Sequence, residues 1–117
     1  MTESVVHQSQ FAHTSAARAE LMAWSDGNAV PLARVEFVPS VVDTDLSLYV
    51  WLFYATDLDI SRLERDGTTQ RLQAEFLAIL GAGGYPAEWL SEVVFCVDSA
   101  ENVERNYDGS YFYRLRG

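Results

Sequence analysis

Pairs of acidic residues have the spacing in this chain that most directly suggests chemistry. Asp43 and Asp45 form one Asp-x-Asp pair, and Asp57 and Asp59 form another. Carboxylate oxygens at this spacing can bind Mg²⁺ or Ca²⁺, but Asp is also common in turns and at helix N-termini. About eleven residues of predicted strand hold the two pairs roughly 30 Å apart, which excludes one two-metal site. The pattern therefore favours turn and capping roles over metal binding.

Nucleophilic catalysis needs a base beside the nucleophile, and the chain has only two histidines. His7 and His13 both lie near the N-terminus, in a stretch polar enough to be weakly ordered. Cys96 lies between apolar neighbours in a predicted buried strand, where burial would raise the pKa of its thiol and make it inert. No Cys or His pair has the spacing of a zinc site. We therefore predict no cofactor and favour a non-enzymatic protein.

Three glycines, Gly81, Gly83 and Gly84, have the composition of a phosphate-binding loop. They follow a predicted helix, whereas a phosphate loop lies between a strand and the N-terminus of a helix. We therefore assign them to a helix cap and a turn.

The C-terminal segment combines aromatic and arginine side chains, the composition of protein interface hot spots. We predict that residues 110–116 form a last strand. If this strand lies at a sheet edge, one of its faces stays partly open to a partner, but the pattern favours rings that only close the core. Arg105, Arg114 and Arg116 could form an anion site or ordinary ion pairs, and their convergence is left open. The predicted binding residues are Tyr107, Tyr111, Phe112, Tyr113, Arg114 and Arg116.

The elements that would position these residues are organised around residues 46–56, LSLYVWLFYAT. Both the odd and the even positions of this segment are apolar, which predicts a central strand covered on both faces by helices or by a second subunit. Residues 34–38 alternate in polarity and end at Pro39, as an edge strand does. We expect these two strands to form an antiparallel hairpin whose loop carries Asp43 and Asp45.

Helical patterns occupy much of the remaining chain. Residues 15–24 are good helix formers, and residues 57–65 favour a short helix over a loop. Thr68 or Thr69 is expected to cap a stronger helix that ends with Gly81 as its left-handed residue. Residues 93–97 form a further apolar run of strand length, and Ser99 is expected to cap a short helix that continues to residue 106.

This order of elements predicts an α+β fold: a mixed four-stranded sheet with helices packed on it. A chain of 117 residues is long enough for a single core and too short for a second domain. We predict a weakly ordered segment over residues 1–14 and one α+β domain over residues 15–117.

The charge balance excludes some partners. The chain has 17 acidic and 8 basic residues, all of the latter arginine, and a net charge of −9. Such a surface repels nucleic acid and anionic lipid, and it favours a basic protein partner. The N-terminus lacks the pattern of a signal peptide, and the longest apolar run is too short to span a bilayer. With its single cysteine, the chain is expected to be a soluble cytoplasmic protein.

The C-terminal third, GYPAEW followed by VVFCVDSAENVERNYDGSYFYRLR, resembles the ending of small uncharacterised bacterial proteins. The shared pattern is a strand, a Ser-x-Glu-x-Val-x-Arg segment, an aromatic residue, a glycine and a tyrosine-rich end. The matching positions are Ser99, Glu101, Val103, Arg105, Tyr107, Gly109 and Tyr113. The resemblance implies a bacterial source and no activity, and no functional residue is carried over from it.

Two classes of function stay open. The leading hypothesis is a non-enzymatic protein-binding module of the inhibitor, immunity or adaptor type, because the chain is acidic and carries aromatic and arginine residues at its end. The alternative is a small-molecule-binding protein or small enzyme. Its pocket would be formed by Trp51, Tyr54, Trp89 or Tyr111, with Asp57, Asp59 or Arg114 as polar groups. A nucleic-acid mimic is a third, weaker hypothesis, and a homodimer would follow if helices cover only one sheet face.

Overall fold

The computed structural model describes residues 5–39 and 47–116. Its helices are α1 (Val5–Gly27), α2 (Asp57–Arg65), α3 (Thr68–Ala82), α4 (Ala87–Leu90), α5 (Ala100–Tyr107) and α6 (Tyr111–Arg116). Its strands are β1 (Leu32–Pro39), β2 (Leu48–Tyr54) and β3 (Val93–Ser99). Asp43 and Asp45 lie outside the described residues. The elements form a single compact α+β domain, which confirms the predicted class.

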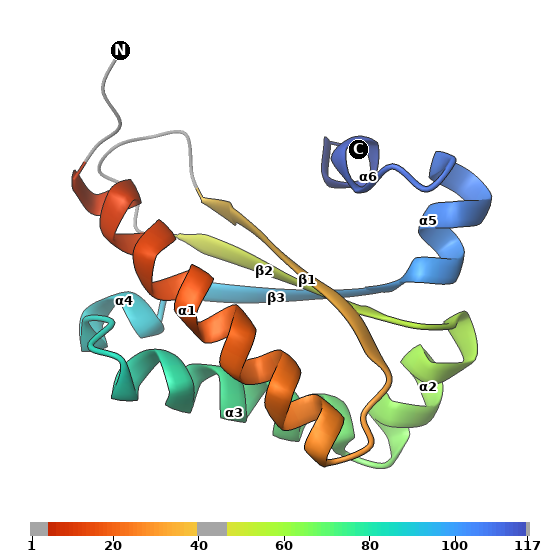
Figure 1. The fold of residues 1–117 in the computed structure, drawn as a ribbon, viewed down its shortest axis with the longest axis horizontal. Helices are drawn as coiled ribbons and strands as arrows, with labels where there is room; N and C mark the ends of the chain where they lie inside the picture. The colour runs from red at the N-terminus through yellow and green to blue at the C-terminus, as the bar shows by residue number, and fades with distance from the viewer. Residues whose placement is uncertain (1–4, 40–46, 117) are drawn as a thin grey trace.

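The described strands form one mixed sheet in the order β1-β2-β3. β1 and β2 are an antiparallel pair, and β3 runs parallel to β2. A parallel pair needs a long crossover, and α2, α3 and α4 supply it. Figure 1 shows α4 at the end of the molecule where β3 begins, and α5 and α6 at the end where β3 finishes. The predicted hairpin and the central position of β2 are confirmed.

The predicted fourth strand over residues 110–116 is wrong, because this segment forms helix α6. Its half-buried residues are Tyr111, Arg114 and Leu115, which have the spacing of one helix face, whereas Phe112, Tyr113 and Arg116 are exposed. The Tyr113 backbone N–H donates to Ser110 Oγ at 3.2 Å, which makes Ser110 a helix cap. The described sheet therefore has three strands, and the segment shows how a short tract can fit both periods.

One face of the sheet, which we call the core face, packs mainly against α1 and α3. Helix α1 precedes the sheet in the chain, and α3 lies between β2 and β3. The four β2 side chains on this face are fully buried: Leu48, Val50, Leu52 and Tyr54. The Tyr54 hydroxyl hydrogen-bonds the Thr69 hydroxyl of α3 at 2.7 Å, so neither polar group is buried without a partner. Burial raises the pKa of Tyr54 and keeps it protonated. The β2 side chains on the core face are therefore shielded from solvent.

Helix ends follow local capping chemistry, with some shifts from the predicted positions. The predicted helix over residues 57–65 is confirmed, and Thr56 caps it in a reciprocal capping box with Asp59. The Ser99 cap of α5 is confirmed by a 2.9 Å hydrogen bond from the Asn102 N–H. The left-handed residue after α3 is Gly84, with φ of 96°, whereas Gly81 lies inside the helix. At the start of α3, Gly67 rather than a threonine is the cap.

Helix α1 begins well before the predicted start at residue 15. Two polar residues in its first half, Gln10 and Thr14, are buried against the domain. The Gln10 side-chain amide donates to the Tyr85 hydroxyl at 3.3 Å, and the Thr14 hydroxyl donates to the Gln10 carbonyl at 2.8 Å. These bonds allow a polar sequence to pack as a helix. The predicted weak order of residues 1–14 stays a prediction.

Candidate functional site

Among residues 5–39 and 47–116, the second face of the sheet, which we call the open face, is covered only at one end. The strand register places three cross-strand rows on it. In order from the end nearest α6, the rows are Arg34–Phe53–Asp98, Glu36–Trp51–Cys96 and Val38–Tyr49–Val94. The first row has a charged residue at each end, and the third row has none.

Helix α6 covers the first row through its aromatic and arginine side chains. The Tyr111 ring stands edge-on to Phe53, with ring centres 4.8 Å apart, and the Arg34 guanidinium lies 4.1 Å from the centre of the Tyr111 ring. Phe53 is fully buried as a result. Burial raises the pKa of Tyr111, and Arg34 partly opposes this shift. Tyr111 therefore acts as a protonated, largely apolar cover in which Arg34 adds a cation–π contact.

Arg114 anchors α6 to the first and second rows. Its Nε donates to Asp98 Oδ2 at 2.5 Å, and its guanidinium lies 4.5 Å from the Trp51 ring centre. The Asn102 side chain also donates to Asp98, at 3.0 and 3.1 Å. Because both charged side chains of the pair are largely removed from water, this ion pair is screened less than a surface pair. It fixes how far α6 extends over the sheet.

The third row remains open. Tyr49 is 42% exposed and Val94 is 44% exposed, while Val38 is half-buried. A six-residue helix is about 9 Å long, whereas a seven-residue strand is about 23 Å long, so α6 cannot cover the whole face. The expectation that residues 46–56 are shielded on both sides is therefore correct for the core face and wrong for the Tyr49 end of the open face.

The predicted binding residues divide into two groups. Tyr107, Tyr111 and Arg114 are half-buried and hold α6 and α5 against the sheet. Phe112 and Tyr113 are 62% and 65% exposed and pack edge-on to each other. The Arg116 guanidinium lies 4.6 Å from the Phe112 ring centre, also at the surface. Only the second group is available to a partner without movement of α6.

The three C-terminal arginines interact with three different partners. Arg105 donates to Asp57 Oδ2 at 2.8 Å, Arg114 pairs with Asp98, and Arg116 stacks on Phe112. In the predicted strand Arg114 and Arg116 would have shared one face, whereas in helix α6 residues two apart point in different directions. The arrangement corresponds to separate interactions rather than to one anion site.

Asp57 and Asp59 have capping and pairing roles. The Ser99 hydroxyl donates to Asp57, and this bond together with Arg105 lowers the pKa of Asp57. Asp59 closes the capping box of α2 and pairs with Arg62 at 2.9 Å, which lowers its pKa as well. Across residues 5–39 and 47–116, no group of three or more His, Cys, Asp or Glu side chains could hold a metal ion.

Cys96 lies in the second row of the open face and is half-buried rather than buried. Burial raises the pKa of its thiol, and Arg114 partly opposes the shift. A protonated thiol is a poor nucleophile, so Cys96 contributes a small apolar surface to this face.

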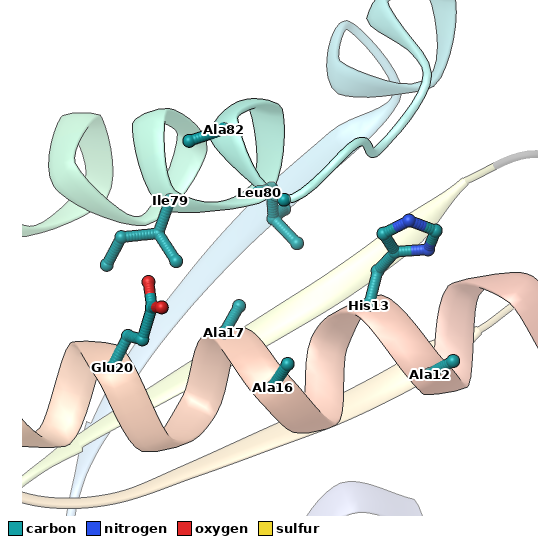
Figure 2. A pocket seen from close by; sticks show the side chains of 9 residues that line it. Ala12, His13, Ala16, Ala17, Glu20, Ile79, Leu80 and Ala82 are labelled. Carbon is teal, nitrogen blue, oxygen red and sulfur yellow. The ribbon is translucent and has the colours of Figure 1, made fainter.

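A cavity of about 320 Å³ lies between α1 and α3. Figure 2 shows Ala16 and Ala17 on one side, Ile79 and Leu80 on the other, and His13 and Glu20 toward its two ends. A second hollow of about 220 Å³ lies between α1 and β1. None of the aromatic, Asp or Arg residues expected to form a ligand pocket lines either of these two spaces. The α1–α3 cavity offers a carboxylate and an imidazole beside alanine.

One acidic residue lies directly before β3, at the end of the sheet that carries the third row. The stretch 72–104 has no basic residue, and its acidic residues are Glu75, Glu88, Glu92, Asp98, Glu101 and Glu104. The Leu48 N–H donates to the Glu92 carbonyl at 3.2 Å, which places Glu92 directly before β3 at this end of the sheet. Glu88 and Glu92 form no ion pair with a described residue. Glu92 therefore adds a negative charge at the end of the sheet that carries Tyr49 and Val94.

Comparison with known proteins provides no family for the chain, because no family model, curated protein or solved structure matches it. Among the helices of the described residues, none is long and apolar enough to cross a membrane.

Sequence reasoning missed Val38, Tyr49 and Val94 as candidate surface residues. The available signal was the apolar character of residues 46–56 on both sides combined with a shortage of helix to cover them. Recognising it requires the register of three strands and the length of α6, which no local pattern contains.

Proposed function

We propose that the protein works by binding a basic partner protein, with the uncovered row Val38–Tyr49–Val94 as the centre of the interface and the exposed side chains of α6 as part of it. The observation that carries this proposal is the exposure of Tyr49 and Val94 on a sheet face whose other end is sealed. Contiguous exposed apolar residues of this kind mark interaction sites. Tyr and Phe are enriched at interfaces because they bury large areas with few rotatable bonds.

The charge of the chain supports a basic partner. Its net charge is −9, and Glu92, directly before β3, forms no ion pair with a described residue. Opposite charge on a partner accelerates encounter and disfavours wrong partners. An inhibitor, immunity or adaptor protein is the kind of molecule that such a surface suits, and a polyanion such as nucleic acid is repelled by it.

The test is capture from a lysate of the source cell with the immobilised chain, comparing wild type with Tyr49→Ser. Leu58→Ser is the matched control, because Leu58 is equally apolar and 68% exposed on α2, away from the open row. We expect a basic protein to be retained by wild type and by Leu58→Ser, released by moderate salt, and lost with Tyr49→Ser. Retention that is equal for all three variants, or no retained protein, would contradict the proposal.

A small-molecule site is the second candidate, and the α1–α3 cavity is the feature that favours it. Its volume lies at the lower end of the range for ligand sites. A thermal-shift screen of metabolites against wild type and Ala16→Leu, which fills the cavity, separates the two functions. A ligand that raises the melting temperature of wild type only would support this candidate, and the absence of any shift would count against it.

A further inference from the structure

The two edges of the sheet differ in how they are protected against an added strand. Edge strands are normally defended by charges, proline or a bulge. β1 has all three: Arg34 and Glu36 lie along it, it ends at Pro39, and its register shifts between residues 32 and 34. This edge is not suited to strand addition.

The other edge, β3, has none of these defences over residues 93–97. The sequence of this stretch is Val-Val-Phe-Cys-Val, and its register with β2 is regular. All five residues are at least partly exposed, while the last two residues of β3, Asp98 and Ser99, are buried. A strand of this composition at a sheet edge is a template for pairing with another chain.

One backbone hydrogen bond identifies the free groups of β3. The Leu48 N–H donates to the Glu92 carbonyl, and in a parallel ladder alternate residues direct both backbone groups toward the same neighbour. Val94 and Cys96 therefore bond to β2, and Val93, Phe95 and Val97 direct their N–H and C=O groups away from it. Within residues 5–39 and 47–116, no hydrogen bond to these outward groups is found.

The charges around β3 specify the kind of strand that it fits. Glu92 precedes the apolar stretch and Glu101 follows it, while the Asp98 carboxylate is already paired with Arg114. A second copy paired antiparallel about Phe95 would bring Glu92 opposite the Asp98–Arg114 pair of the other molecule, which offers Glu92 no free cation. An extended segment with apolar residues in its centre and Lys or Arg at its ends is complementary to this edge.

We propose that the basic partner adds an extended segment to β3 as the fourth strand of the sheet. This inference rests on the proposed function and adds its binding mode, in which backbone hydrogen bonds supply affinity and alternate side chains supply specificity. Val94 belongs both to this edge and to the open row, so one bound segment contacts the two surfaces together.

Amide hydrogen exchange measured by NMR tests the binding mode residue by residue. In the free protein we expect the outward amides of Val93, Phe95 and Val97 to exchange faster than the laddered amides of Val94 and Cys96. The probe is a synthetic ten-residue peptide with alternating Val and Thr between terminal Lys residues, and its control has terminal Glu residues. The basic peptide should slow exchange at the three outward amides by about tenfold or more, and the acidic peptide should leave them unchanged.

Substitution at Val94 supplies a second readout that does not depend on the core. Val94→Lys places a cation on an exposed side chain at the edge, and Val94→Thr keeps shape and β-propensity. We expect Val94→Lys to weaken peptide binding about tenfold and Val94→Thr to change it less than about threefold.

Three outcomes would overturn either strand addition by the partner or the proposed binding surface. Unchanged outward amides with the basic peptide would do so, and if capture still depends on Tyr49, the proposed function stands without this binding mode. Outward amides that are slow in the free protein and become faster on dilution would assign the edge to a second copy. Protected outward amides combined with capture that does not depend on Tyr49 would leave strand addition standing and overturn the proposed surface.

Discussion

The two faces of β2 have similar apolar composition but different covers. On the core face, Tyr54 and its three apolar neighbours are sealed by helices of 23 and 15 residues. On the open face, burial decreases from Phe53 through Trp51 to Tyr49 under a helix of six residues. Whether an apolar strand face becomes core or binding surface therefore depends on the length of the helix that covers it.

The helices α3 and α6, which cover the two faces, also differ in the kind of contact that they make with the sheet. α3 seals the core face with apolar and aromatic packing, in which Phe76 contacts Phe37 and Phe95 with ring centres 5.8 and 6.2 Å apart. α6 is held over the open face by Arg34 and Arg114, which stack on rings and pair with carboxylates. Ion pairs and cation–π contacts near the surface contribute less than apolar burial does. The open face is therefore the weaker half of the domain.

The largest loss of stability is expected from a substitution in the packing of the core face. Phe76→Ala removes a fully buried ring and should lower the free energy of unfolding by about 3–5 kcal/mol. Urea denaturation followed by tryptophan fluorescence measures the loss. Phe76→Leu, which keeps most of the volume, should cost about 1 kcal/mol and remain folded. A loss below about 1 kcal/mol for the alanine variant would mean that α3 does not seal this face.

The second-largest loss of stability is expected when the Arg114–Asp98 ion pair that holds α6 is removed. Asp98→Ala leaves the partly buried Arg114 without its carboxylate and should cost about 1–3 kcal/mol. The near-ultraviolet circular dichroism of Trp51 should also change, because Arg114 stacks on it. Arg116→Ala removes only an exposed contact to Phe112 and should cost less than about 0.5 kcal/mol. Equal losses for the two variants would contradict the anchoring role.

A smaller loss of stability is expected from substitution of Ser99, at the end of β3 where α2 and α5 come together. Ser99→Ala removes both the cap of α5 and the hydrogen bond to Asp57 and should cost about 1 kcal/mol. Ser99→Thr retains a hydroxyl and should recover most of this loss. Ser61→Ala, on the exposed side of α2, is the control and should be neutral within about 0.5 kcal/mol. A neutral Ser99→Ala variant would rule out the cap as a determinant of stability.

The loss of stability in acid should depend on the same group of contacts, through the Asp57 carboxylate. The pKa of Asp57 lies below its ordinary value of 3.8 because of the Ser99 hydrogen bond and Arg105. The stability from this group is therefore present above the unfolded pKa and lost as pH falls through the lower folded pKa. Urea midpoints between about pH 2 and 5 should fall less steeply for Asp57→Asn than for wild type. Parallel curves for the two proteins would contradict this assignment.

The smallest effect on stability is expected at the open row. Tyr49→Ser should change the free energy of unfolding by less than about 0.5 kcal/mol, because the side chain is already exposed to water. The same variant is expected to have the largest effect on partner capture. A loss above about 2 kcal/mol in urea denaturation would assign Tyr49 to the core and remove the distinction between the two faces.

Much of the fold follows from local sequence patterns. The hairpin of β1 and β2, the helices α2 and α5, and the strand β3 are encoded by alternation, capping residues and short apolar runs, so they can be predicted without knowledge of the rest. The segment 110–116 could not be assigned in this way, because its seven residues satisfy a strand period and a helix period equally. The Ser110 cap and the ring of Phe53 beneath Tyr111 support the helix, and the second of these comes from a distant strand.

For the candidate site, local patterns are enough to predict an acidic chain, an apolar central strand and a C-terminal group of aromatic and arginine residues. The roles of these residues depend on the folded arrangement, which placed Tyr111 and Arg114 over one end of the sheet and left Tyr49 and Val94 exposed at the other. The physical reason is that side-chain type and period are local properties, whereas burial depends on which element lies above a residue and how far that element extends.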